Sequence, residues 1–137
     1  MDPVIQSFLI GFPVLLLHFS VTLAMLAGGV IIYQMITPYH ELDLIRAGNN
    51  AAAISLSGAI VGLALPLAFC MAQSVNVWDI VIWGVVTLVI QLLAYRVGDA
   101  VVKGLATRIE AGEIGAAILV VAIKLAIAMI NAAAVAG

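Results

Sequence analysis

Charged residues are scarce in this chain, and that scarcity narrows the function classes at once. Five Lys and Arg and seven Asp and Glu make up only 9% of its 137 residues. A soluble domain covers its core with about a quarter charged residues, so the composition argues against a soluble globular enzyme. Five basic residues are also too few to follow a phosphate backbone, and we expect no nucleic-acid partner.

Signatures of catalysis and of covalent cross-linking are missing as well. A single cysteine, Cys70, cannot build a disulfide scaffold. The sequence has no glycine-rich phosphate loop and no paired-histidine metal motif. We therefore expect no enzymatic activity, no cofactor and no metal site.

Long apolar runs are abundant instead. Hydrophobic residues make up 66% of the chain and the mean hydropathy is +1.29. About 20 consecutive apolar residues cross the hydrocarbon of a bilayer as a helix. The runs of that length are Phe8–Met35, Ala51–Ala72, Asp79–Val102 and Ile114–Val135. The sequence predicts an all-α, integral membrane four-helix bundle that forms one membrane domain over residues 1–137. The leader Met1-Asp2-Pro3 carries no basic residue, so we expect a retained first helix rather than a signal peptide.

The basic residues predict the orientation of the bundle. Arg46 follows the first run, whereas Arg96, Lys103 and Arg108 lie at or beyond the end of the third. Because basic loops stay in the cytoplasm, both termini are expected in the periplasm of a bacterial inner membrane. Trp and Tyr residues favour the membrane–water interface, so we expect Trp78 and Trp83 at the outer interface and Tyr33, Tyr39 and Tyr95 at the inner one.

An internal repeat becomes visible when the chain is shifted by 64 positions. Residues 45–54 then align with residues 109–118, with six identities in ten. The sequence thus predicts two similar transmembrane hairpins, residues 1–73 and 74–137, related by an axis along the membrane normal. The alternative is that any two membrane hairpins rich in Ala, Gly and Ile look alike.

Lys124 is the most informative residue of the chain. It lies ten residues into the fourth run, where a cation costs roughly 2.5–3.5 kcal/mol on insertion scales. No acidic residue is expected at the same depth, because Asp99 lies closer to the membrane edge and shares an interfacial face with Arg96 and Lys103. Polar residues of three runs could line a pathway for an ion or small polar solute: His18, Gln91, Lys124 and Asn131. The alternatives are a buried network that fixes helix register and contact of Lys124 with a lipid phosphate.

Small residues form a stripe on the second run. Ser55, Gly58 and Gly62 lie on one helix face and include a GxxxG spacing. Such a stripe lets two helix backbones approach closely. The contact could lie inside one bundle or between two copies of the chain.

Several motifs together resemble a known family. They are Tyr33…Ile36-Thr37-Pro38…Glu41…Leu44-Ile45…Asn49-Asn50…Ala52, Ser57-Gly58…Gly62…Pro66-Leu67, Ile90-Gln91-Leu92-Leu93 and Asn131-Ala132-Ala133. This pattern resembles the YjfL-like inner-membrane proteins, the domain of unknown function 350. The resemblance implies a four-helix bacterial inner-membrane protein made of two similar hairpins, and its most specific part is the loop with Thr37, Pro38, Glu41, Asn49 and Asn50. Members are often encoded near phage-shock-protein-A-like genes, which implies a role in membrane maintenance.

Two functions are compatible with these observations. In the first, a homo-oligomer in membrane lipid forms a pathway for an ion or small polar solute. In the second, a nonconducting membrane scaffold for envelope maintenance or stress response recruits a cytoplasmic protein through loops 38–50 and 103–113. A pathway needs wetted polar seams, whereas a scaffold needs exposed cytoplasmic surface.

Overall fold

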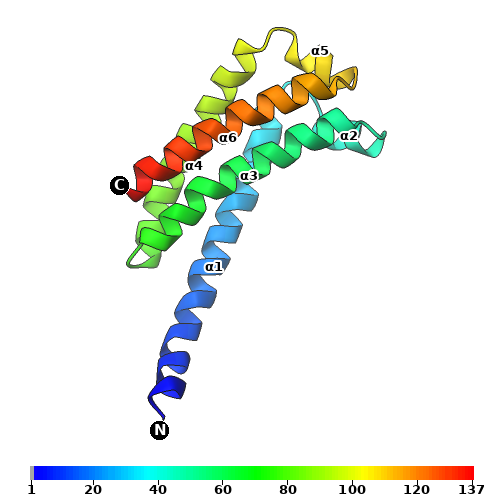
Figure 1. Cartoon of the computed structure of the whole chain (residues 1–137). Helices are drawn as coiled ribbons and strands as arrows, with labels where there is room; N and C mark the ends of the chain where they lie inside the picture. Colours follow the sequence, from blue (N-terminus) through cyan, green and yellow to red (C-terminus); the bar gives the residue numbers. More distant parts are fainter. Residues whose placement is uncertain (1) are drawn as a thin grey trace.

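Four long helices and two short ones make up the computed structural model, which describes residues 2–137 (Figure 1). The long helices are α1 (Pro3–Ile36), α3 (Asn50–Gln73), α4 (Val77–Val101) and α6 (Ile114–Ala136). Each is long and apolar enough to cross a membrane, which confirms the all-helical class and the four predicted spans. The short helices α2 (Glu41–Arg46) and α5 (Leu105–Glu110) occupy segments that the sequence had indicated only as loops.

Helices α3 and α6 form the centre of the bundle. They lie side by side and run in the same direction, with α4 packed against both (Figure 1). Their apposition depends on small residues: a Cβ added to Gly58 would lie 2.5 Å from Val121 of α6, and one added to Gly62 would collide with the Tyr95 hydroxyl of α4. With the buried Ser55, the small-residue stripe therefore packs inside one chain.

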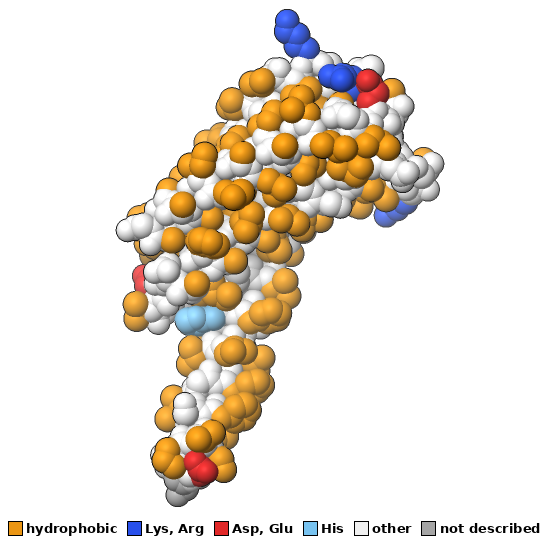
Figure 2. Space-filling view, viewed as in Figure 1, with side chains coloured by type: hydrophobic (Ala, Val, Ile, Leu, Met, Phe, Trp, Pro, Cys, Tyr) orange, Lys and Arg blue, Asp and Glu red, His pale blue; other side chains and the backbone are white. Residues whose placement is uncertain are grey.

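Helix α1 packs against α3 and α4 with its C-terminal half and leaves the bundle over its N-terminal half. Only Gly29 and Tyr33 are buried in this 34-residue helix, and its N-terminal half projects away from the other helices (Figure 1). Figure 2 shows hydrophobic side chains covering this projection and the visible face of the bundle, as expected for surfaces that face lipid or another apolar helix.

The short helices share one end of the bundle, and the turn between α3 and α4 lies at the other end with the last residue of α6 (Figure 1). Asn49 joins α3 to α5 at the end that carries the short helices: its side chain accepts a hydrogen bond from Ala52 N at 3.0 Å and donates one to Ile109 O at 2.8 Å. The starts of α2 and α5, and those of α3 and α6, are each 64 residues apart. Gly48 and Gly112, also 64 apart, both adopt a positive φ (89° and 80°) before the next long helix. The two-hairpin duplication itself stays a prediction.

Candidate functional site: a buried charge cluster

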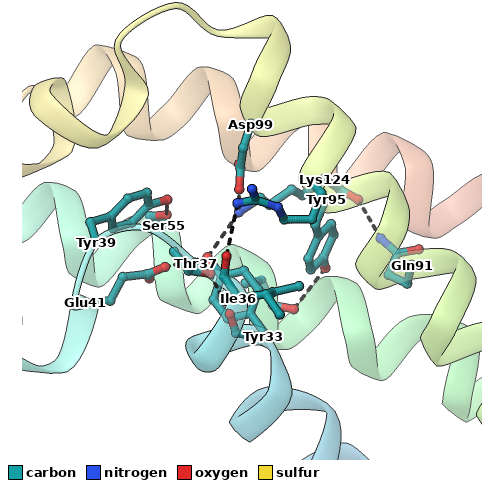
Figure 3. Close-up of polar contacts among 12 residues, drawn as sticks. Tyr33, Ile36, Thr37, Tyr39, Glu41, Ser55, Gln91, Tyr95, Asp99 and Lys124 are labelled. Carbon is teal, nitrogen blue, oxygen red and sulfur yellow. Dashed lines mark hydrogen bonds and ion pairs between the residues drawn. The ribbon is translucent and has the colours of Figure 1, made fainter.

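A cluster of ionisable side chains is buried among α1, α2, α4 and α6. Its centre is Lys124 of α6, whose side chain is fully buried about 15 Å along its helix. Lys124 Nζ lies 3.3 Å from Asp99 Oδ1 and donates to the Tyr33 hydroxyl at 3.1 Å (Figure 3). The Asp99 side chain is only 8% exposed, so this is a buried ion pair.

The Asp99 pair corrects the sequence-based depth argument. Asp99 was expected at the membrane edge, on an interfacial face with Arg96 and Lys103. Instead its carboxyl group faces the interior of the bundle and meets the Lys124 ammonium group. Lys124 reaches this level because its side chain leans toward the start of α6, and Asp99 lies near that same end of the bundle. Arg96 stays exposed and donates to Ile36 O at 3.0 Å.

Aromatic rings surround the ammonium group. Nζ lies 4.8 Å from the ring centroid of Tyr33 and 5.0 Å from that of Tyr95, distances at which the ring faces attract a cation. The Tyr95 hydroxyl donates to Ala59 O at 2.9 Å. Tyr39 is buried too, with its hydroxyl 3.0 Å from Ser55 Oγ. All three tyrosines are therefore buried inside the bundle.

Glu41 adds a second carboxyl group to the cluster. This first residue of α2 is only 3% exposed, and its Oε1 accepts a hydrogen bond from the Tyr33 hydroxyl. Its Oε2 is buried and has no hydrogen-bond partner among residues 2–137. Burial raises the pKa of Glu41 from 4.5 to about 7; the Tyr33 hydrogen bond and the Lys124 charge lower the pKa, and the Asp99 charge raises it.

The Glu41 side chain borders a pocket at the end of the bundle that carries α2 and α5. The pocket has a volume of about 220 Å³ and is lined by Gln34, Thr37, Tyr39, His40, Glu41, Leu42, Asp43 and Arg46. Burial raises the pKa of Tyr39 to about 12 against the opposing hydrogen bond from Ser55, so its hydroxyl stays neutral in this pocket. Glu41 is thus the point where the cluster comes closest to this pocket.

Amide side chains continue the polar contacts away from the cluster. Gln91 Nε2 donates to Lys124 O at 3.3 Å, and Asn131 Nδ2 donates to Gln91 Oε1 at 3.2 Å and to Thr87 O at 3.1 Å. We call this series of buried groups between α4 and α6 the polar seam. It brings together three of the four pathway candidates.

His18, the fourth pathway candidate, is not brought to the seam. It lies half-buried on α1, and its backbone carbonyl accepts from the Thr22 hydroxyl at 2.7 Å. This contact stays within α1 and does not extend toward the seam.

The family loop has structural roles that its sequence pattern did not reveal. The Thr37 hydroxyl donates to Tyr33 O at 2.6 Å, and Pro38 leads into the loop that carries Tyr39. Asn49 caps α3, whereas Asn50 is exposed as its first residue. Sequence reasoning missed the partners of Lys124, namely Asp99, Tyr33 and Glu41. The available signal for Asp99 was an acidic residue three positions before the end of the apolar run Asp79–Val102.

Comparison with known proteins fits this architecture. The model of the family described as Domain of Unknown Function (DUF350) matches residues 7–135. The chain belongs to the DUF350 family. It is 37% identical over 78 residues to the UPF0719 inner membrane protein YjfL of Escherichia coli (strain K12), covering 57% of this chain and 59% of that relative. It is 27% identical over 78 residues to the UPF0719 transmembrane protein YshE of Bacillus subtilis (strain 168), covering 57% and 58%.

These alignments span less than two thirds of each relative's length. No solved structure matches this DUF350 chain.

Proposed function

We propose that this DUF350 protein is a multi-pass protein of the bacterial inner membrane that forms, as a homo-oligomer, a pathway for an ion or small polar solute. The name of its relative YjfL supports the location, and the positions of Arg46, Lys103 and Arg108 support cytoplasmic α2 and α5 with periplasmic termini.

The observation that carries the proposal is the buried Lys124. Replacing a buried ion pair by well-packed apolar residues is often neutral or stabilising, so a bundle that only had to fold would not need this pair. Ionisable residues at membrane depth are expensive, and they mark ion pathways and relays. Lys124 meets two carboxyl groups here, those of Asp99 and, through Tyr33, Glu41.

The polar seam supports a path rather than an isolated site. From Lys124, the contacts pass through Gln91 to Asn131, toward the end of the bundle that lies opposite α2 and α5. Near that end, a pocket of about 380 Å³ is bordered by Ser74, Asp79 and Ala134. Polar groups therefore occur at several levels between the two ends of the bundle.

Oligomerisation is proposed on the grounds of size and surface. One bundle of four helices has too few helices to enclose a wide pore, and the projecting half of α1 has no partner within the described chain. Several copies would surround a path that one copy does not enclose. The mass of the purified protein in detergent, measured by light scattering, tests this part: a monomer would contradict it.

The experiment for the pathway is ion flux into liposomes that contain the purified protein. Protons, K⁺ and Cl⁻ are followed separately with ion-sensitive dyes, for the parent and for Lys124→Gln. We expect flux of one of these ions in the parent and at least a tenfold loss in the variant. Arg108→Gln is the control, because Arg108 is exposed and pairs with Glu113 away from the cluster. No flux in the parent, or equal flux in Lys124→Gln, would refute the proposal.

A nonconducting scaffold is the second candidate, favoured by the gathering of α2 and α5 at one end. Lys and Arg side chains are visible at this end in Figure 2, and the exposed Arg46 and Arg108 belong to it. Such a surface could recruit a cytoplasmic protein. The test is a pull-down from membranes with loops 38–50 and 103–113 exchanged for unrelated loops. A partner that is lost on exchange supports the scaffold, and recovery of no partner contradicts it.

A further inference from the structure

The buried charge cluster contains one positive group for two acidic groups, and the exposed Arg96 lies beside Asp99 at its edge. Lys124 contacts Asp99 directly and reaches Glu41 through the Tyr33 hydroxyl. If both carboxyl groups are ionised, the cluster carries a net negative charge in a region shielded from water. A proton removes that charge, so the composition of the cluster favours one bound proton.

One carboxyl oxygen of the cluster has no partner of either kind. Glu41 Oε2 is buried and accepts no hydrogen bond within the described residues, whereas Asp99 Oδ1 lies 3.3 Å from Lys124 Nζ and is paired with that charge. A buried carboxylate oxygen without a donor is unfavourable, because it has lost its contacts with water. Protonation of Glu41 removes the charge from this carboxyl group and relieves part of that cost.

We propose that Glu41, Tyr33, Lys124 and Asp99 together hold one exchangeable proton, taken up from the pocket beside Glu41, and that the proton is the ion of the pathway. This inference rests on the proposed function for its second half, because a path must exist for the proton to be its ion. The first half, a proton-binding site, stands on the cluster alone.

The contacts allow the proton to move from Glu41 to Asp99 with all atoms and charges balanced. Lys124 first gives a proton from Nζ to the Asp99 carboxylate and becomes a neutral amine. Protonated Glu41 then gives its proton to the Tyr33 oxygen, while the Tyr33 hydroxyl gives its own proton to the Lys124 amine. At the end Glu41 is ionised, Asp99 is protonated, and Tyr33 and Lys124 are restored.

Both ends of this transfer lie toward the same end of the bundle. Asp99 borders a second pocket, of about 350 Å³, which is lined by the end of α4, the segment that follows it, the start of α5, and Pro38 and Tyr39. The cluster is therefore loaded from the side that carries α2 and α5. Departure toward the opposite side would follow the polar seam that begins at Gln91.

The charged and titratable groups near Glu41 come from every element packed against it. They are Tyr33 of α1, Tyr39 of the preceding loop, Asp99 of α4, Lys124 of α6, and His40, Asp43 and Arg46 around the pocket. The pKa of Glu41, about 7 in this setting, supports proton exchange at neutral pH.

Infrared spectroscopy tests the proton site without any flux. The carboxylic-acid C=O band of the protein in liposomes is recorded as a function of pH. We expect one acid to titrate with a midpoint near 7 in the parent and in Glu110→Gln, whose exposed glutamate serves as the matched control. Glu41→Gln should lose this transition. Absence of any carboxyl transition between pH 5.5 and about 8.5 would overturn the proton site.

Flux measurements test whether the proton is the ion that moves. Tyr33→Phe removes the hydroxyl that joins Glu41 to Lys124 and keeps the ring, so proton flux should fall at least tenfold while Glu41 still titrates. Ser57→Ala, which removes an exposed hydroxyl that donates to Ala53 O within α3 and lies outside the cluster, is the control. Proton flux that is unchanged in Tyr33→Phe overturns the relay.

The two proposals fail in distinguishable ways. Flux of K⁺ or Cl⁻ without protons overturns the inference that the proton is the ion and leaves the pathway standing. No flux of any ion overturns the pathway, and the infrared titration then decides the proton site by itself. Each variant is first checked for helical circular dichroism, so that loss of folding is not read as loss of relay.

Discussion

Replacing Lys124 by methionine should destabilise the bundle strongly, because the long apolar side chain fills the space but leaves two acidic groups without their cation. The parent lysine makes a 3.3 Å ion pair with Asp99, a 3.1 Å hydrogen bond to Tyr33 and contacts with two aromatic rings. A hydrogen bond to a charged group contributes about 1.5–3 kcal/mol, and a desolvated cation–π contact up to about 2 kcal/mol.

The expected loss is set by the charge that is left behind rather than by the sum of these contacts. Breaking a buried pair by removing one partner costs about 3–5 kcal/mol, whereas replacing both partners by apolar groups is often neutral. We therefore expect Lys124→Met to lose about 3–5 kcal/mol, and Lys124→Met with Asp99→Leu to recover at least half of that loss.

Reversible unfolding in mixed detergent micelles, followed by circular dichroism, measures these differences. The matched control is Lys103→Met: the chain has two lysines, and Lys103 is exposed, so its change should stay within about 0.5 kcal/mol. A Lys124→Met protein as stable as the parent would refute the reasoning. A double variant no more stable than Lys124→Met would show that the pairing with Asp99 is not the cause.

Three further predictions use the same unfolding assay. Gly62→Ala should lose about 1–3 kcal/mol, because the new Cβ collides with the Tyr95 hydroxyl on the neighbouring helix. Asn49→Ala should lose about 1–2 kcal/mol, because it removes the cap of α3 and the bond to Ile109 O. Glu41 has a folded pKa of about 7, above its ordinary 4.5, so its contribution to stability is complete below pH 4.5 and is lost as pH rises to about 7; Glu41→Gln should abolish this decline of about 3 kcal/mol.

Matched substitutions keep these predictions specific. Gly11→Ala adds a Cβ with no atom within 4 Å and should change stability little. Asn50→Ala alters an exposed neighbour of the cap, and Asp43→Asn an exposed acid on the same short helix as Glu41. Equal losses in a variant and its control, or a pH profile of Glu41→Gln that matches the parent, would contradict the corresponding explanation.

The sequence predicts Lys124 as a site residue, but it does not predict the partner of Lys124. A cation in the middle of an apolar run is visible in the sequence, and so are Gln91 and Asn131 at compatible depths. The sequence does not predict the pairing with Asp99, because the position of a residue along its own apolar run gives the depth of its backbone and not the reach of its side chain. The length and lean of the lysine side chain decide which acid it reaches.

Glu41 and His18 also show that the sequence does not reveal which side chains the fold brings together: Glu41 joins the cluster, and His18 does not join the seam. Glu41 stood out only as part of a family-like loop, and nothing local to it indicates that α2 carries its side chain into the bundle. His18 is a polar residue in an apolar run, as the seam residues are, but α1 diverges from the other helices toward its N-terminus and keeps the imidazole away from the seam.

The sequence by itself determined the four spans and the small-residue stripe. Hydrocarbon imposes a length and an apolarity on each helix separately, and both properties can be read along the chain. Only the tertiary structure decided which polar groups meet, because that depends on how α1, α4 and α6 cross and on where a short helix turns its first side chain. Four residues separated by up to 91 positions became one charge cluster through those crossings.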